Sequence, residues 1–347
     1  MLPPRLVRRI VLAPLLMVIA LGLVVLFPLL AIATAIIGLY RSRRLRTFRL
    51  LCFAVIWLLA ETAALVMCLG LWVASGFGGR LHSEPYLRRH YAIMRWFLDL
   101  LFRSAVRTFG LRVLVTEPTL DDVEAAARLT RPVVVLSRHA GPGDSFLLVR
   151  QLLSVYRRRP RVVMKAAIQL DPGLDVVGNR LPNVFVSHRR FGESLYTEQI
   201  ARLAHGLGPA DALVIFPEGG NWTPGRWRRG ILRLEQVGRP DLAKRAEQMP
   251  NLLPPRPGGA LTAITACPQA DVIFVAHAGL DKLASVRDVW QNLPIGQPLR
   301  AQWWRVPCEQ VPRDAPPEEQ VQWLYAWWER IDAWISAQES APESAQQ

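Results

Sequence analysis

The chain has 347 residues, which is enough for a large hydrophobic core and for more than one domain. It is 51% hydrophobic and carries a formal net charge of +14. Residues 1–110 hold 14 Arg/Lys against 3 Asp/Glu (+11), whereas residues 111–347 hold 28 against 25 (+3). Because the basic excess flanks apolar segments, it favours contact with anionic membrane lipids and argues against a nucleic-acid partner.

Two apolar segments dominate the first 80 residues. Residues 11–40 contain no charged residue, and residues 51–79 contain only Glu61. Each exceeds the roughly 20 apolar residues that cross a bilayer as a helix. Both are too long for a cleaved signal peptide. The sequence therefore predicts a membrane-bound protein whose residues 1–80 form an anchoring pair of helices.

The charges around these segments leave two topologies open. Arginines flank the pair on both sides and also fill the short link between the two segments, which the positive-inside rule disfavours for a hairpin that spans. Either both helices span, or the pair dips into one leaflet and returns, with a break at Pro28. In both cases we expect the remainder of the chain on the cytoplasmic face of the inner membrane.

Short apolar strands then alternate with helices. Strands are predicted at residues 111–115, 132–136, 161–164, 184–187, 212–216 and 272–275. Helices are predicted at residues 84–101, 120–129, 145–156, 193–204, 240–248 and 317–337. The helix at 84–101, rich in arginine and aromatic residues, suits either the membrane interface or packing on the sheet. The tryptophans of the last helix are expected in the core.

This alternation is typical of an α/β fold with a mostly parallel central sheet flanked by helices. We expect one catalytic domain over residues 81–337 and a polar, disordered tail over residues 338–347. The four cysteines show no Cys-x-x-Cys spacing, which argues against a disulfide framework and against a zinc site. No metal is therefore expected, and no oligomeric state is predicted.

A polar turn follows the strand at 132–136. His139 leaves the end of this strand, Gly141-Pro142-Gly143 indicates a tight turn, and Asp144 comes five positions after His139. The ends of strands in open α/β sheets are where ligands bind. A histidine beside a carboxylate is typical of a general base with its orienting partner.

This pair resembles the His-x-x-x-x-Asp motif of the glycerolipid acyltransferases, the lysophosphatidic acid acyltransferase family. A second match, Phe216-Pro217-Glu218-Gly219, looks like the Phe-Pro-Glu-Gly block of that family, in the expected order and at the expected separation. The resemblance covers roughly residues 90–290. It implies catalysis by His139 and Asp144 without a covalent enzyme intermediate.

The resemblance also implies the substrates. A membrane-bound O-acyltransferase of this kind moves a fatty acyl group from acyl-CoA or acyl-carrier protein to a lysophospholipid. The default acceptor is 1-acyl-glycerol-3-phosphate, which gives phosphatidic acid. The expected partners are membrane lipids, the lysophospholipid acceptor and the acyl donor. No cofactor is implied beyond the donor itself.

Substrate-binding residues follow from the same resemblance. In the family the second block helps to bind the acceptor phosphate, which implies this role for Glu218, Gly219 and Gly220. The chain departs from the family at two positions, because Gly220 stands where a threonine is usual and Asn221 where an arginine is usual. Further phosphate contacts are expected from nearby basic residues, namely Arg226 as a substitute cation, Lys165 at a strand end, and Arg189.

Three alternatives stay open. The departures around Gly220 suit acylation of another lysolipid or of a glycolipid. A hydrolase of lipid esters or thioesters is a second class, although the Gly-x-Ser-x-Gly elbow of α/β-hydrolases is missing and Ser145 suits a helix start. A non-catalytic adaptor that binds anionic lipid is a third. His277 either lines the acceptor site or is packed in the interior.

Overall fold

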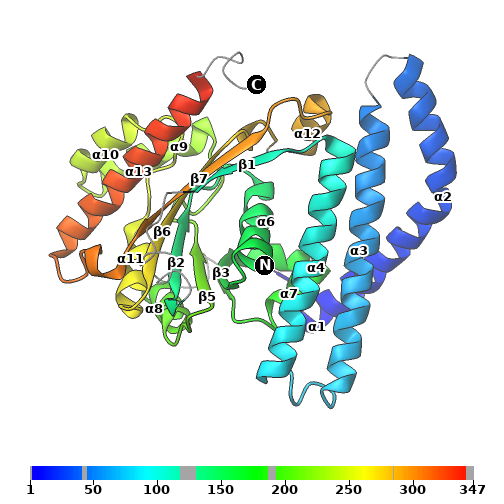
Figure 1. Ribbon diagram of the computed structural model, residues 1–347, viewed down its shortest axis with the longest axis horizontal. Helices are drawn as coiled ribbons and strands as arrows, with labels where there is room; N and C mark the ends of the chain where they lie inside the picture. Colours follow the sequence, from blue (N-terminus) through cyan, green and yellow to red (C-terminus); the bar gives the residue numbers. More distant parts are fainter. Residues whose placement is uncertain (1, 41–44, 118–129, 187–192, 284, 341–347) are drawn as a thin grey trace. The chain divides into compact units, whose positions relative to one another are not determined.

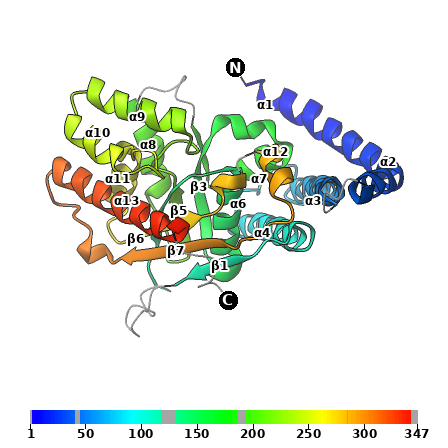
Figure 2. The same ribbon diagram turned by 90° about the horizontal axis from the view of Figure 1, so that it is seen from above.

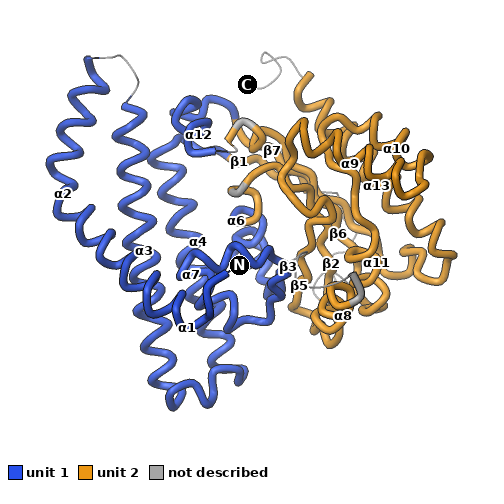
Figure 3. Tube along the Cα trace, turned by 180° about the vertical axis from the view of Figure 1, so that it is seen from behind, with its two compact units in different colours: residues 1–112, 146–190, 285–297 blue, residues 113–145, 191–284, 298–347 orange. Residues whose placement is uncertain are grey.

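The computed structural model describes residues 2–40, 45–117, 130–186, 193–283 and 285–340. These residues form two compact units, each assembled from separate stretches of the chain (Figure 3). Unit 1 comprises Met1–Arg112, Phe146–Arg190 and Ser285–Gln297, and unit 2 comprises Val113–Ser145, Phe191–Ala284 and Pro298–Gln347. The apolar N-terminal helices therefore share a unit with residues that follow position 80.

Long helices form the frame of unit 1. They are α1 (Arg5–Val7), η1 (Arg8–Leu12), α2 (Ala13–Tyr40), α3 (Arg46–Ala74) and α4 (Glu84–Phe109). Helix α3 lies beside both α2 and α4 (Figures 1 and 2). The stretches Arg5–Tyr40 and Arg46–Ala74 are long and apolar enough to cross a membrane, by length and composition. Helix α2 continues through Pro28, so the break proposed at this proline is not present.

Helix α4 is amphipathic and longer than predicted. Its buried face includes Tyr91, Ile93 and Leu98, and this helix packs along α3. The other elements of unit 1 are η2 (Gln151–Val155), β3 (Arg159–Lys165), η3 (Ala166–Leu170), α7 (Pro172–Gly178), β4 (Val184–Val186) and α12 (Val286–Asn292). Strands β3 and β4 are parallel.

Five strands of the sheet form the centre of unit 2, in the order β1-β7-β6-β2-β5. Its strands are β1 (Val113–Thr116), β2 (Val133–Ser137), β5 (Asp211–Ile215), β6 (Asp271–Ala278) and β7 (Leu299–Val306). Strand β2 pairs in parallel with β5 and β6, and β1 pairs in parallel with β7, whereas β6 and β7 are antiparallel. The sheet is thus mostly parallel, and β2 and β5 are buried along their whole length, as their continuous apolar sequences predict.

Helices flank this sheet. They are α6 (Pro142–Arg150), which begins in unit 2, α8 (Glu193–Ala204), α9 (Pro224–Gln236), α10 (Pro240–Glu247), α11 (Pro257–Ala266) and α13 (Pro317–Ser340), with short turns η4 (Asp281–Leu283) and η5 (Cys308–Gln310). Helix α11 packs on β2 and β5, and α13 packs on β6. On α13, Trp327 stacks on Phe274 with ring centroids 4.5 Å apart, and Trp328 is fully buried. Of the tryptophans of this helix, Trp328 is therefore a core residue, and Trp323, Trp327 and Trp334 are half-buried.

The structure adds elements that the sequence patterns did not predict, namely β7, α7, α9, α11 and α12. Helix α13 runs three residues past its predicted end, to Ser340, so the first part of the expected tail is helical. The predicted helix at 120–129 and the tail beyond position 340 lie outside the described residues.

Candidate active site

His139 and Asp144 form a hydrogen-bonded pair beyond the carboxyl end of β2. His139 Nδ1 lies 3.0 Å from Oδ1 and 2.9 Å from Oδ2 of Asp144. The carboxylate side chain is 2% exposed and the imidazole 16% exposed. Within the described part of the chain, Nε2 of His139 has no hydrogen-bond partner. One ring nitrogen is therefore held by a carboxylate, and the other is available to a substrate.

The turn between the two residues closes around the carboxylate. Asp144 Oδ2 accepts the backbone N–H of Ala140 at 2.7 Å and that of Gly141 at 3.1 Å, and Oδ1 accepts the hydroxyl of Ser145 at 3.1 Å. Burial disfavours the charged carboxylate, but the hydrogen bond to His139, the neighbouring His277 and the backbone donors outweigh it and hold the pKa of Asp144 below its ordinary value. An ionised carboxylate only accepts hydrogen bonds, so Nδ1 of His139 carries the ring proton.

The second block folds against the same histidine. Phe216 follows β5, and its ring lies 4.7 Å from the imidazole of His139, centroid to centroid. Glu218 is 2% exposed; its Oε1 accepts the backbone N–H of His139 at 3.0 Å, and its Oε2 accepts that of Leu253 at 3.2 Å. Burial raises the pKa of Glu218 to about 8, although nearby Arg138 opposes the shift. The Glu218 carboxylate thus faces the backbone and holds the turn that carries His139.

The residues after Glu218 make a tight loop. Gly219 has a φ of +66°, a left-handed conformation that glycine adopts without strain. Gly220 is buried, and Trp222 donates its backbone N–H to the His139 carbonyl at 2.8 Å. Arg226, in the first turn of α9, is exposed, and its guanidinium donates to the Asn221 carbonyl at 3.0 Å. Both blocks and Arg226 therefore belong to unit 2.

Two of the predicted substrate contacts are not tested by the structure. Lys165 is an exposed residue at the end of β3 and belongs to unit 1. Arg189 lies outside the described residues. Their predicted contacts with phosphate stay predictions.

Two further buried residues lie next to the pair: Arg138, which was not predicted as part of the site, and His277, for which both a place at the acceptor site and a packed interior position were left open. Arg138 directly precedes His139, and its guanidinium donates to the His277 carbonyl at 2.6 Å and pairs with Asp281 at 2.9 Å. His277 is buried at the end of β6, with Nε2 3.6 Å from Asp144 Oδ2. Burial, followed by the charge of Arg138, lowers the pKa of His277 to about 4, so its imidazole is neutral. The sequence could have identified Arg138 as a residue of the site, because it is a charged residue directly after a buried apolar strand.

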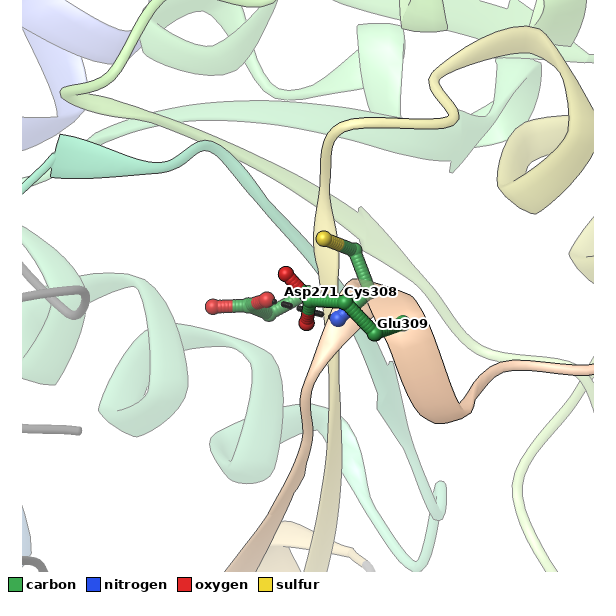
Figure 4. Close-up of side chains that lie close together, drawn as sticks. All are labelled: Asp271, Cys308 and Glu309. Carbon is green, nitrogen blue, oxygen red and sulfur yellow. Dashed lines mark hydrogen bonds between the residues drawn. The ribbon is translucent and has the colours of Figure 1, made fainter. Parts of the chain in front are cut away.

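A separate polar cluster in unit 2 has side chains of the kinds that bind metals. Figure 4 shows Asp271 at the start of β6 together with Cys308 and Glu309 of η5. Arg131 occupies the space between them, because its Nη1 lies 2.6 Å from Glu309, 3.0 Å from Cys308 Sγ and 3.7 Å from Asp271. Asp271 also pairs with Arg305 at 2.8 Å. The guanidinium groups neutralise these acids, and the cluster holds β6 to the chain after β7.

Comparison with models of protein families gives a match. Residues 118–274 match the family model described as Acyltransferase. A search among curated proteins found no match. The matched range contains β2, β5, His139, Asp144 and the loop after Glu218. Over residues 118–274 the chain therefore carries an acyltransferase domain of the glycerolipid acyltransferase family.

Proposed function

We propose that this protein is a membrane-bound O-acyltransferase that moves a fatty acyl group from acyl-CoA or acyl-carrier protein to a lysophospholipid. The proposed acceptor is 1-acyl-glycerol-3-phosphate, and the product is phosphatidic acid. The observation that carries the proposal is the His139–Asp144 pair with an unoccupied Nε2, inside an acyltransferase-family domain. We expect no metal and no cofactor besides the acyl donor, since proton transfer by the imidazole is sufficient for this reaction.

The geometry suits direct transfer. Because Asp144 holds the proton on Nδ1, Nε2 of His139 accepts the proton of the acceptor hydroxyl. The hydroxyl oxygen attacks the carbonyl carbon of the thioester, the new C–O bond forms, and the C–S bond breaks. The thiolate leaves and takes the proton from Nε2. Asp144 stabilises the imidazolium between these two proton transfers.

Two alternative reactions differ in their support. Hydrolysis through a serine nucleophile is disfavoured, because the Ser145 hydroxyl donates to Asp144. Acylation of a different lysolipid or of a glycolipid fits the same chemistry. The replacement of the usual threonine and arginine by Gly220 and Asn221 supports such a different acceptor.

We propose membrane attachment through α2 and α3, with the start of this hairpin and the turn between its two helices on the same side of the membrane. At the start of the hairpin, Arg8 lies 2.6 Å and Arg9 2.8 Å from the carboxylate of Asp175 in α7. At the turn between the helices, Arg46 donates to the Leu293 carbonyl at 2.8 Å and Arg49 to the Thr108 carbonyl at 2.9 Å. These partners all belong to segments of unit 1 outside α2 and α3.

Further contacts along α3 support the same arrangement. Glu61 accepts the backbone N–H of Gly173 at 3.1 Å, and Arg180 donates to the Cys68 carbonyl at 2.6 Å. Helix α4, which carries five arginines, packs along α3 as well. A helix with polar neighbours at its start, middle and end has no bilayer-length stretch free for lipid. The exposed apolar side chains of α2 are then available to enter one leaflet, on the cytoplasmic face of the inner membrane.

The test of the reaction uses the full chain in detergent micelles with labelled acyl-CoA and a panel of lysolipid acceptors. We expect lysophosphatidic acid to be acylated by the wild type and His139→Ala to lower the rate by about 10²–10⁴-fold. His205→Ala, which changes an exposed histidine of unit 2, is the control and should leave the rate unchanged.

Undiminished transfer by His139→Ala would rule out the proposed mechanism. Transfer to another acceptor alone would keep the mechanism and change the substrate. Release of free fatty acid at a rate independent of the acceptor would favour the hydrolase.

A further inference from the structure

Arg256 brings an exposed guanidinium to the loop that supports His139. Its backbone N–H donates to the Pro217 carbonyl at 2.9 Å, which fixes its place beside the second block. A Cβ placed on Gly219 would come within 3.2 Å of the Arg256 Cζ and 3.3 Å of its Nε and Nη1. The guanidinium therefore lies directly against Gly219, next to the residue whose carboxylate holds the His139 backbone.

A second glycine opens space for a polar neighbour. Tyr196 of α8 is close enough to Arg256 for the positive charge to favour ionisation of the phenol, although burial dominates and raises the pKa of Tyr196. The Tyr196 hydroxyl lies 2.8 Å from the position of a Cβ on Gly259, so any larger residue there would displace it. Gly219 thus leaves room for the Arg256 guanidinium and Gly259 for the Tyr196 phenol, and both groups can hydrogen-bond an anion.

Other exposed arginines of unit 2 are placed differently. Arg226 donates to the Asn221 carbonyl, and Arg228 lies two residues further along α9. Arg256 belongs instead to the segment that follows Leu253. The side chain of Glu218 connects this segment to the His139 loop, because it accepts the backbone N–H groups of both Leu253 and His139. The Arg256 guanidinium lies against Gly219, and the preceding residue, Glu218, supports the backbone of the general base His139. The guanidinium is therefore well placed to bind a charged group of the acceptor close to the reacting hydroxyl, and its fork matches phosphate oxygens.

We propose that Arg256 binds the anionic phosphate group of the acceptor, from its place over Gly219 beside the His139 loop. This assignment rests on the proposed function and names the residue that gives the site its preference for a phosphorylated acceptor. The diphosphate of an acyl-CoA donor presents the same chemistry, so the test separates the two sources.

The experiment compares Arg256→Gln with the wild type in full-length protein, using labelled acyl-CoA with lysophosphatidic acid or with an uncharged monoacylglycerol. We expect the KM for lysophosphatidic acid to rise at least 10-fold, while kcat and the KM for acyl-CoA change less than threefold. The kcat/KM for monoacylglycerol should stay unchanged. Arg256→Lys keeps the charge without the fork and should lie between the two. Arg228→Gln, on the exposed face of α9, is the matched control and should change none of these constants.

Each other outcome overturns a defined statement. A KM for lysophosphatidic acid that is equal in Arg256→Gln and wild type removes Arg256 from the acceptor site and leaves the proposed function standing. A raised KM for acyl-CoA alone assigns Arg256 to the donor and overturns the proposal. A wild type that acylates only uncharged acceptors overturns both the acceptor assignment and the role of Arg256. Equal melting temperatures of the variants and the wild type verify that folding is unaffected.

Discussion

Two buried carboxylates touch His139, and their surroundings drive them to opposite charge states. Asp144 receives a ring N–H, two backbone N–H groups and a hydroxyl, which together favour its ionised form. Glu218 receives two backbone N–H groups and is otherwise enclosed, so burial dominates and favours its neutral form. The number of hydrogen-bond donors therefore sets the two roles: Asp144 is an anion that orients the base, and Glu218 is a neutral group that holds the backbone.

The raised pKa of Glu218 predicts a pH-dependent stability. Such a group contributes stability that is fully present below its unfolded pKa, near 4.5, and is lost as the pH rises through its folded value of about 8. Glu218→Gln removes this titration, because an amide stays neutral at every pH. We therefore expect the melting temperature of the variant, relative to wild type, to increase between pH 5 and pH 8 and to level off above pH 8.

Circular dichroism melts of both proteins at several pH values measure this difference. Glu198→Gln on α8 is the control, since that side chain is 56% exposed and its substitution should give a difference that is flat with pH. A flat difference for Glu218→Gln as well would contradict the assignment of a neutral, buried Glu218.

At the scale of elements, α13 shows how a helix outside the motifs stabilises the sheet that carries them. Its buried face includes Leu324, Trp328 and Ile331, and Phe274 of β6 packs against three of its tryptophans. Strand β6 pairs with β2, which leads into His139. Packing of α13 on β6 therefore also supports β2, the strand that ends next to the general base His139.

Trp328→Ala tests this packing. The side chain is fully buried, so its removal leaves a large cavity and should lower the free energy of unfolding by about 3–5 kcal/mol. Urea denaturation followed by fluorescence measures the loss. Ala326→Ser, at an exposed position of the same helix, should change it by less than about 0.5 kcal/mol. A loss below 1 kcal/mol for Trp328→Ala would mean that α13 is not part of the cooperative core.

Continuous apolar sequences predicted strands correctly, whereas elements with mixed or glycine-rich sequences were missed. Continuous apolar runs predicted β2 and β5 because strands of a parallel sheet are buried on both faces. Strand β7 was missed because its sequence, Leu299-Arg-Ala-Gln-Trp-Trp-Arg-Val306, mixes arginine and glutamine with tryptophan. It is a strand because it pairs with both β1 and β6. Helix α11 was missed because Gly258 and Gly259, directly after Pro257, indicate a loop.

At the scale of the whole molecule, the topology of the hairpin predicts a labelling pattern. In a variant without its four cysteines, single cysteines are introduced as Pro4→Cys, Tyr40→Cys and Ala333→Cys, all at exposed positions. Pro4 and Tyr40 lie at opposite ends of the first apolar stretch, and Ala333 on α13 is the reference. Because Arg8 and Arg9 near its start, and Arg46 and Arg49 shortly after its end, contact segments of unit 1 outside the hairpin, we expect a membrane-impermeant maleimide to label all three in inside-out vesicles and none in spheroplasts.

Labelling of Tyr40→Cys in spheroplasts, together with labelling of Pro4→Cys only in inside-out vesicles, would show that the stretch spans the bilayer. The contacts of Arg46 and Arg49 would then not exist in the membrane. Replacement of both arginines by glutamine serves as a second check, since a hairpin held at one surface depends on these contacts.

The sequence by itself determined the α/β class, the apolar helix pair and the two blocks that meet at His139. These features depend on local periodicity and short spacings, which the order of residues records directly. Tertiary structure alone decided that Glu218 faces backbone rather than solvent, that His277 lies beside Asp144 with Arg138 bound to the His277 carbonyl, and that Arg256 lies over Gly219. These contacts join residues 35–139 positions apart, and burial and packing select such partners without leaving a local pattern.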